Sequence, residues 1–161
     1  MNEKITPPFL SSMTGRFFSV GILIVFSALG AFFFLDIGKS KHSSSSQKVK
    51  IGEVVYSLEI ADTEMRREKG LGGRDTLCES CGMLFVFETR GQYAFWMQDM
   101  RFPIDIIWLL ENRIVFVQHD VDPEFSGILN PMVFADTVLE LGAGKGQNLR
   151  VGEEMQFLYG G

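Results

Sequence analysis

The sequence predicts a mostly β domain, a compact sheet or open β-barrel of about seven short strands with one short helix, preceded by one transmembrane helix. Two observations predict the β domain. Apolar and polar residues alternate along residues 54–60, and several short apolar runs are separated by turn residues. A third observation predicts the membrane helix, because residues 17–35 form an uncharged run of 19 residues.

The uncharged run at residues 17–35 has only Ser19 and Ser27 as polar members. At about 1.5 Å per residue it spans roughly 28 Å, which is close to the hydrocarbon thickness of a bilayer. A soluble core helix needs a polar face, and this run has none. We therefore interpret residues 1–16 as a tail and residues 17–37 as the anchor through which the chain meets the membrane.

A cleaved signal peptide is the alternative interpretation of the N-terminus. Lys4 and Arg16 would form its basic leader, and the Ala-Leu-Gly of residues 28–30 its cleavage site. Cleavage there would leave the apolar residues 32–35 as an exposed terminus, which favours the uncleaved anchor.

A Ser- and Lys-rich linker at residues 38–47 joins the anchor to the domain at residues 48–161. The four lysines that follow the anchor favour a cytoplasmic domain under the positive-inside rule. Export is the usual outcome for an N-terminal signal anchor, and we expect a single-pass protein with an extracytoplasmic domain.

The domain is acidic, since residues 48–161 hold 11 Lys and Arg against 18 Asp and Glu, a net charge of −7. Nucleic-acid binding depends largely on cations that neutralise phosphates, so this charge balance excludes nucleic acid as a partner. It also gives the domain no attraction to anionic lipid. We expect no cofactor.

The elements expected first are a strand at residues 54–60 and a short helix. Asp62 can cap this helix and Gly70 can close it, and Glu64 in the first turn suits the helix dipole. The remaining strands are expected at residues 83–87, 93–97, 104–110, 114–118, 138–141 and 155–159.

Two of these expectations concern neighbouring segments. The run at residues 104–110 is nearly all apolar and should be buried on both faces, and Glu111-Asn112 offers a tight turn into the next strand. Residues 142–150 are expected to hold one weak helical turn.

Four ordered motifs carry a family resemblance: REKGLGGR at residues 67–74, GMLFVF at 82–87, FWM at 95–97 and PIDII at 103–107. The chain resembles the bacterial and archaeal family called domain of unknown function 192, or uncharacterised ACR, over about residues 50–160. The resemblance implies a small mostly β fold, often behind a signal or anchor, and no established reaction.

The sequence departs from the family pattern in two places. The family usually has Met where Gly72 stands, and an Asn-Thr pair where Asp99-Met100 stands. A ligand site shaped by these positions would differ in charge.

Asp105 is a candidate site residue because a regular strand at residues 104–110 places it on one face with Ile107 and Leu109. A carboxylate among apolar neighbours is costly unless it is paired or hydrogen-bonded. Arg67 and Arg74 are the candidate partners.

Trp96 and Met97 complete this candidate site. With Asp105 and an arginine they would form a pocket with an aromatic floor, a carboxylate and a guanidinium, suited to a sugar or another small polar ligand. The alternative is a buried ion pair that stabilises the barrel, with Trp96 in the core.

Cys78 and Cys81 are the two cysteines of the chain. Their C-x-x-C spacing allows a surface disulfide, a redox pair or half of a zinc site. A thioredoxin-like βαβ context is missing, and no further residues show ligand spacing, so we expect a disulfide and no metal.

These observations predict a membrane-tethered, extracytoplasmic binding module for a small polar ligand or a protein partner. An enzyme is less favoured because the sequence shows no nucleophile–base pair. The alternatives are a thiol redox or metal protein that uses Cys78 and Cys81, and a structural envelope protein.

Overall fold

The computed structural model describes residues 46–159, so the tail, the anchor and most of the linker lie outside the described residues. No helix within residues 46–159 has the length and apolar character needed to cross a membrane. Seven strands and one helix follow in chain order: β1 (Ser46–Ile51), β2 (Val54–Ala61), α1 (Glu64–Lys69), β3 (Cys81–Gly91), β4 (Ile104–Leu110), β5 (Arg113–Val121), β6 (Ala135–Gly142) and β7 (Met155–Leu158).

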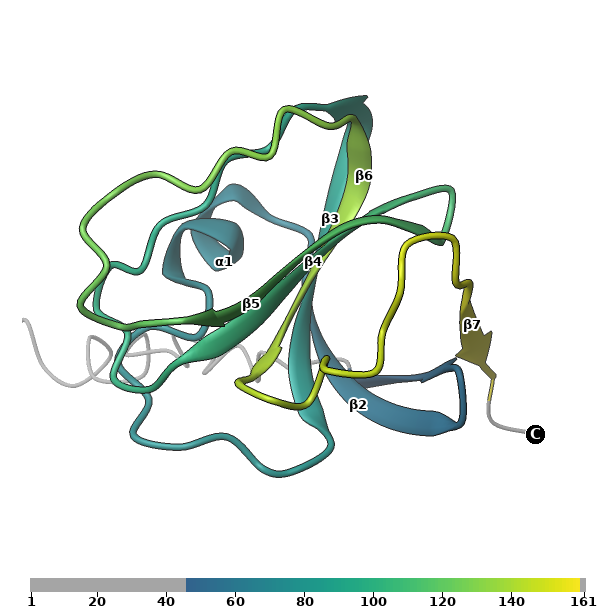
Figure 1. Cartoon of the computed structure of the whole chain (residues 1–161), viewed down its shortest axis with the longest axis horizontal. Coiled ribbons are helices and arrows are strands. Elements are labelled where there is room, and N and C mark those ends of the chain that lie inside the picture. Colours follow the sequence, from purple (N-terminus) through teal and green to yellow (C-terminus); the bar gives the residue numbers. More distant parts are fainter. Residues whose placement is uncertain (1–45, 160–161) are drawn as a thin grey trace, which may run out of the picture. The chain divides into compact units, whose positions relative to one another are not determined.

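The strands form one mixed sheet in the order β5-β4-β6-β3-β2-β1-β7, curled into a half-barrel (Figure 1). Only the β2–β3 pair is parallel within this sheet, and α1 lies in the connection between those two strands. The prediction of a mostly β fold with seven strands and one short helix is confirmed.

The predicted and observed numbers of strands agree, but two of the individual predictions are wrong. Residues 93–97 are not a strand, since their only ladder contact is an isolated bridge between Phe95 and Leu129. Conversely, β1 was not predicted as a strand, and it begins at Ser46, two residues before the expected domain boundary. The alternation of lysines with Val49 and Ile51 is too short to stand out beside a Ser-rich linker.

Helix α1 begins one residue later than the sequence suggested. Thr63, not Asp62, is the N-cap, and its side chain accepts a hydrogen bond from the amide of Arg66. Gly70 ends the helix as expected, with a φ of 50° that disfavours residues with a side chain. The expectation of a weak helical turn within residues 142–150 is also wrong, because residues 143–148 form turns and no residue of this segment is helical.

The β4–β5 hairpin was predicted correctly. Glu111 and Asn112 both have positive φ, 51° and 63°, as the favoured two-residue hairpin turns require. Further along the hairpin the register shifts, so that Ile104 pairs with Val121 while Ile106 pairs with Gln118. This shift is a bulge in β5.

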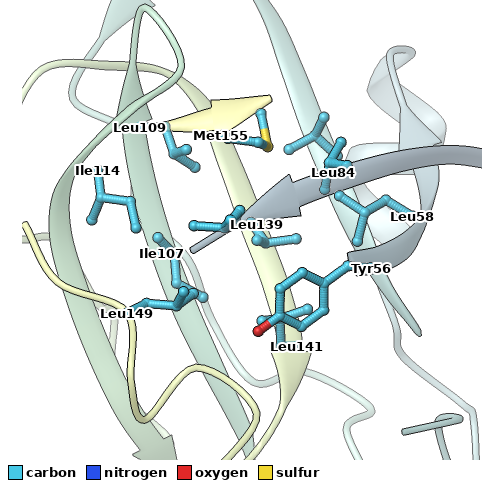
Figure 2. Packing of buried hydrophobic residues seen from close by; sticks show 12 residues of the cluster. Tyr56, Leu58, Leu84, Ile107, Leu109, Ile114, Leu139, Leu141, Leu149 and Met155 are labelled. Carbon is cyan, nitrogen blue, oxygen red and sulfur yellow. The ribbon is translucent and has the colours of Figure 1, made fainter. Parts of the chain in front are cut away.

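Both faces of the sheet are buried by separate apolar clusters. On one face, side chains from β2, β3, β4, β6 and β7 point toward one another, among them Leu58, Ile107 and Leu139 (Figure 2). On the other face, Trp108 and Val138 pack with residues of the connections between strands. Figure 1 shows α1 and the long connections after β3 and β5 on the side of the β3–β6 pair opposite β7. This second face carries the pocket described below.

Candidate functional site

A cavity of about 360 Å³ opens between α1, β3 and the segment that follows β3. Its lining is mainly aromatic and apolar, with a few charged groups contributed by α1 and β6. The residues that define it are Arg67, Gly70, Phe87, Tyr93, Trp96 and Glu140.

One wall of the pocket is a three-layer stack. The rings of Phe87 and Tyr93 lie face to face with centroids 3.5 Å apart and planes within 10°. The guanidinium carbon of Arg67 lies 5.3 Å from the Phe87 centroid. Because the Tyr93 ring lies only 3.5 Å from Phe87, no other group fits on that face of Phe87. Arg67 therefore covers the opposite face of the Phe87 ring. Arg67 Nη1 also donates to the carbonyl of Val86 at 2.9 Å, which ties the stack to β3.

The segment after β3 is held in place by aromatic contacts below it. Phe95 is 9% exposed and makes edge contacts with Phe85 and Trp108, with centroids 5.0 and 5.8 Å apart. Trp108 Nε1 donates to the carbonyl of Tyr93 at 2.8 Å. Trp96 lies between Phe95 and Met97, which is 4% exposed, and is itself 52% exposed and lines the pocket. A large indole on a fixed backbone therefore faces the pocket.

Glu140 on β6 supplies a buried carboxyl group to this pocket. The residue is 4% exposed, and the amide of Leu71 donates to its carboxyl group. Its Oε2 has no hydrogen-bond partner among residues 46–159. Burial raises the pKa of Glu140 to about 8, against the smaller lowering effects of the Leu71 amide and of Arg74. At neutral pH the group is therefore mainly a neutral acid.

The backbone around Gly70 lies close to this carboxyl group. A Cβ at Gly70 would lie 3.6 Å from Glu140 Oε2 and 3.4 Å from the Phe85 ring. Glu140 pairs with Met83 and Ile106 across the sheet, and both of these belong to the second apolar cluster. The carboxyl thus faces α1 and the pocket.

Four of the five residues predicted for a ligand site lie on this face of the molecule. Arg67 and Trp96 line the pocket, and Met97 is 4% exposed in the apolar cluster beneath it. Arg74 does not line the pocket. It forms a two-pronged ion pair with Glu59 on β2, with N–O distances of 2.5 and 2.9 Å, and its charge acts on Glu140.

Asp105 lies elsewhere, on the opposite face of the sheet. It is fully buried and accepts hydrogen bonds from the amides of Asp120 at 2.9 Å and Gly146 at 2.7 Å. His119 Nδ1 is 3.7 Å away. Asp120 has a φ of 52° in the β5 bulge, so Asp105 fixes that bulge and the start of the β6–β7 connection. Neither expected arginine is its hydrogen-bond partner.

A family model described as uncharacterized ACR, domain of unknown function 192, matches residues 47–157. The chain belongs to this family. Among curated proteins the comparison found no match.

Two solved structures resemble this member of the family. One is a candidate transcription regulator from Sinorhizobium meliloti 1021, with 24% identity and a TM-score of 0.68 over 71% of this chain and 95% of that one. The other is a protein of unknown function from Novosphingobium aromaticivorans, with 24% identity and a TM-score of 0.64 over 68% of this chain and 83% of that one. At this identity the likeness shows the fold alone.

The three positions at which we expect departures from the family pattern lie beside the pocket. Gly72 and Met100 line both the pocket and an adjoining hollow, and Asp99 lines the hollow. A Cβ at Gly72 would lie 2.9 Å from the carbonyl oxygen of Lys69, so the present backbone leaves no space for a larger residue. Departures at these positions would therefore change the surroundings of the pocket.

Glu140 was missed from the sequence although a signal was present. A carboxyl group within the apolar run at residues 138–141 is as unexpected as Asp105 within residues 104–110. The argument that selected Asp105 applies equally to Glu140, and only the structure shows which one meets a cavity.

A disulfide joins Cys78, in the turn before β3, to Cys81, the first residue of β3, and the amide of Cys81 donates to the carbonyl of Cys78. Neither cysteine lines the pocket. The turn is tied to the rest of the domain by a 2.6 Å ion pair between Glu79 and Lys145. Within the described part of the chain, no three His, Cys, Asp or Glu residues group closely enough to hold a metal ion.

Proposed function

We propose that the domain is a binding module for a small polar ligand with an apolar face, and that a carbohydrate unit has the chemistry that fits best. The observation that carries this proposal is a buried carboxyl with an unpartnered oxygen in a pocket that also presents an exposed indole. Glu140 supplies the first group and Trp96 the second. Such a pair recognises molecules that are polar at their edges and apolar on one face.

The size and stiffness of the pocket support this proposal. A cavity of about 360 Å³ suits one small molecule. The Arg67–Phe87–Tyr93 stack and the buried side chains of Phe95 and Met97, on either side of Trp96, hold its walls in place. A preformed site loses little conformational entropy when a ligand binds.

The lining residues that the structure describes lack the Ser–His and Cys–His pairs that are typical of acyl-transfer enzymes. Among the residues that line the pocket there is no Ser, Thr, Cys or His. A nucleophile activated by an adjacent base is the usual signature of covalent catalysis. The lining offers instead carboxyl, guanidinium, ammonium and aromatic groups, which are the common means of holding a polar ligand.

We also propose that residues 17–37 hold this module at the extracytoplasmic side of a membrane. The uncharged run and a disulfide in an exposed turn support this location, since disulfides persist mainly in oxidising compartments. A membrane-impermeant maleimide should label Cys78 and Cys81 in intact cells only after reduction. Labelling that requires cell lysis would place the domain in the cytoplasm and contradict the proposal.

Ligand binding can be tested on the full chain in detergent micelles. Methyl glycosides and N-acetylhexosamines would be titrated while the backbone amide signals of the lining residues Gly70 and Gly72 are followed by NMR, because the Trp96→Ala variant keeps these signals. We expect a saturable shift with at least one of these sugars and a loss of affinity of about tenfold or more in Trp96→Ala, because stacking on the indole is removed.

The matched control is Phe134→Ala. Phe134 is 56% exposed, much like Trp96, and it does not line the pocket. This variant should bind as the wild type does. Equal affinity in the wild type and Trp96→Ala would remove the pocket from the binding site, and no saturable shift with any of these sugars would reject carbohydrate as the ligand.

A further inference from the structure

Among the residues that the structure describes, Glu140 Oε2 has no hydrogen-bond partner, and stacking of a ligand on the aromatic residues of the pocket would not supply one. Buried polar atoms in folded proteins nearly always have a partner, and an unsatisfied one costs free energy. Here one carboxyl group receives a single hydrogen bond, from the Leu71 amide, and Oε2 receives none from residues 46–159. Glu140 also lines the pocket, although Oε2 itself is almost completely covered, so a ligand can supply the missing partner once the carboxyl group turns toward the cavity.

The charged groups around Glu140 do not neutralise it by direct contact. Arg74 acts on it from a distance while paired to Glu59 on β2. Its neighbours across the sheet, on β3 and β4, are Met83 and Ile106, which carry no charge. The other charged residues that line the pocket all come from α1, and they are Glu64, Arg67, Glu68 and Lys69.

A cationic ligand is the first alternative to weigh, because carboxylates beside aromatic rings can hold ammonium groups. Such sites combine an open aromatic face with an opposite charge. The exposed indole of Trp96 offers the face, but the charges from α1 cancel, with Glu64 and Glu68 against Arg67 and Lys69. A protonated Glu140 adds no negative charge, so the pocket has no net charge that favours a cation.

We propose that the ligand carries a neutral hydrogen-bond acceptor, such as a hydroxyl, ether or carbonyl oxygen, which accepts a hydrogen bond from the protonated carboxyl of Glu140. The site therefore selects neutral polar molecules over organic cations of the same shape. This inference rests on the proposed function and states the chemistry of the same pocket.

A dependence on pH follows from this arrangement. Burial raises the pKa of Glu140 to about 8, so the carboxyl is a donor at neutral pH and an anion well above pH 8. The anion cannot donate to the ligand oxygen. Affinity should therefore be constant well below pH 8 and fall by up to about tenfold per pH unit above it.

Two planar probes of equal shape and different charge test the inference. Benzamide offers a neutral carbonyl acceptor, and benzamidine replaces that oxygen to give a cation. Each would be titrated into the full chain in micelles at pH 6.5 and pH 9.5, with the Trp96 indole signal as readout. We expect benzamide to bind at pH 6.5, to weaken about tenfold or more at pH 9.5, and to outcompete benzamidine at pH 6.5.

The variant Glu140→Gln keeps a neutral donor without a titrating group, so benzamide binding should lose its pH dependence. If this variant does not fold, the benzamide affinities of the wild type at pH 6.5 and pH 9.5 still test the inference. Tighter binding of benzamidine, equal benzamide affinity at both pH values, or no benzamide binding at pH 6.5 would each overturn the inference.

The sugar titration separates this inference from the proposed function. If sugars bind through Trp96 while benzamide fails, the pocket is a carbohydrate site and the donor role of Glu140 is wrong. If neither sugars nor benzamide bind, both proposals fail together.

Discussion

Asp105 and Glu140 are two buried carboxyl groups on adjacent strands, and they differ in almost every other respect. In the β4–β6 ladder, Asp105 pairs with Leu141 while Glu140 pairs with Ile106, so the two side chains leave opposite faces of the sheet. Asp105 accepts two backbone hydrogen bonds, at 2.7 and 2.9 Å. Glu140 has one oxygen without a partner among the described residues.

This comparison teaches that burial alone does not identify a binding residue. Both groups are less than 5% exposed, yet Asp105 meets backbone amides and Glu140 meets a cavity. A satisfied carboxylate stabilises the fold, whereas an unsatisfied carboxyl group beside a cavity is a candidate for ligand binding. Counting hydrogen-bond partners separates the structural role of Asp105 from the binding role proposed for Glu140.

The largest loss of stability at a single pH is expected from Asp105→Ala. It leaves the amides of Asp120 and Gly146 without their acceptor, and hydrogen bonds to a charged group contribute about 1.5–3 kcal/mol each. We expect the free energy of unfolding to fall by roughly 3 kcal/mol or more. Urea denaturation followed by the fluorescence of the buried Trp108 measures it.

Asp75→Ala is the matched control for Asp105→Ala. Asp75 is an 82% exposed carboxylate paired with Arg101, and such surface pairs contribute at most about 1 kcal/mol. A similar loss of stability in the two variants would contradict the structural role assigned to Asp105.

The next effect concerns Glu140→Gln and the pH dependence of stability. The folded pKa of about 8 lies above the ordinary value of 4.5, so only the folded state holds this proton between those pH values. The stabilisation that this proton gives to the folded state is complete below about pH 4.5 and is lost as the pH rises through about 8.

We therefore expect Glu140→Gln to remove a slope of up to about 1.4 kcal/mol per pH unit from the wild-type stability curve between about pH 5 and 8. Urea titrations of both proteins across this window measure it. Parallel curves would show that Glu140 titrates normally in the folded domain.

A smaller loss is expected when the disulfide is removed. The bond between Cys78 and Cys81 closes a very short loop, for which chain entropy predicts roughly 2 kcal/mol. The double variant Cys78→Ser/Cys81→Ser should lose about this much stability and keep its ligand affinity, because neither residue lines the pocket.

Lys145→Ala, which breaks the exposed ion pair with Glu79, is the control and should cost less than about 1 kcal/mol. A loss of ligand affinity in the double cysteine variant would show that the disulfide turn and the pocket are coupled.

The smallest change in stability is expected for Trp96→Ala, which should stay within about 0.5 kcal/mol of the wild type. The indole is 52% exposed, and the neighbouring Phe95 and Met97 supply the buried contacts of the segment. Calorimetric melting of the two proteins measures it. A large loss would mean that Trp96 is a core residue, which is the alternative that the sequence left open.

Much of the sheet could be predicted because its signals are local. Residues 104–110 were assigned with the same bounds as β4, and the two positive φ values at Glu111 and Asn112 match the expected turn. Val54–Ala61 shows the alternation of a strand with one better-buried face. Each of these elements is specified by side-chain periodicity or turn chemistry within a few residues.

The pocket could be predicted only in part, because it depends on packing between distant segments. Residues 93–97 have the composition of a strand, yet Phe95 and Met97 are buried to anchor a loop that presents Trp96. The partners of Asp105 are backbone amides from β5 and the β6–β7 connection. The sequence does not show which backbone amides donate to a side chain. It therefore suggests arginine partners for a buried carboxylate and does not show that backbone amides take this place.

The pairing of β1 with β7 has a consequence for how the domain is made. These strands are the first and last of the sheet in chain order, and Lys48 lies opposite Leu158. Contacts between such distant residues form late and slow folding. During synthesis, β1 therefore keeps an open edge until the final strand emerges, and a chain shortened by the few residues of Met155–Leu158 would expose that edge to pairing with other molecules.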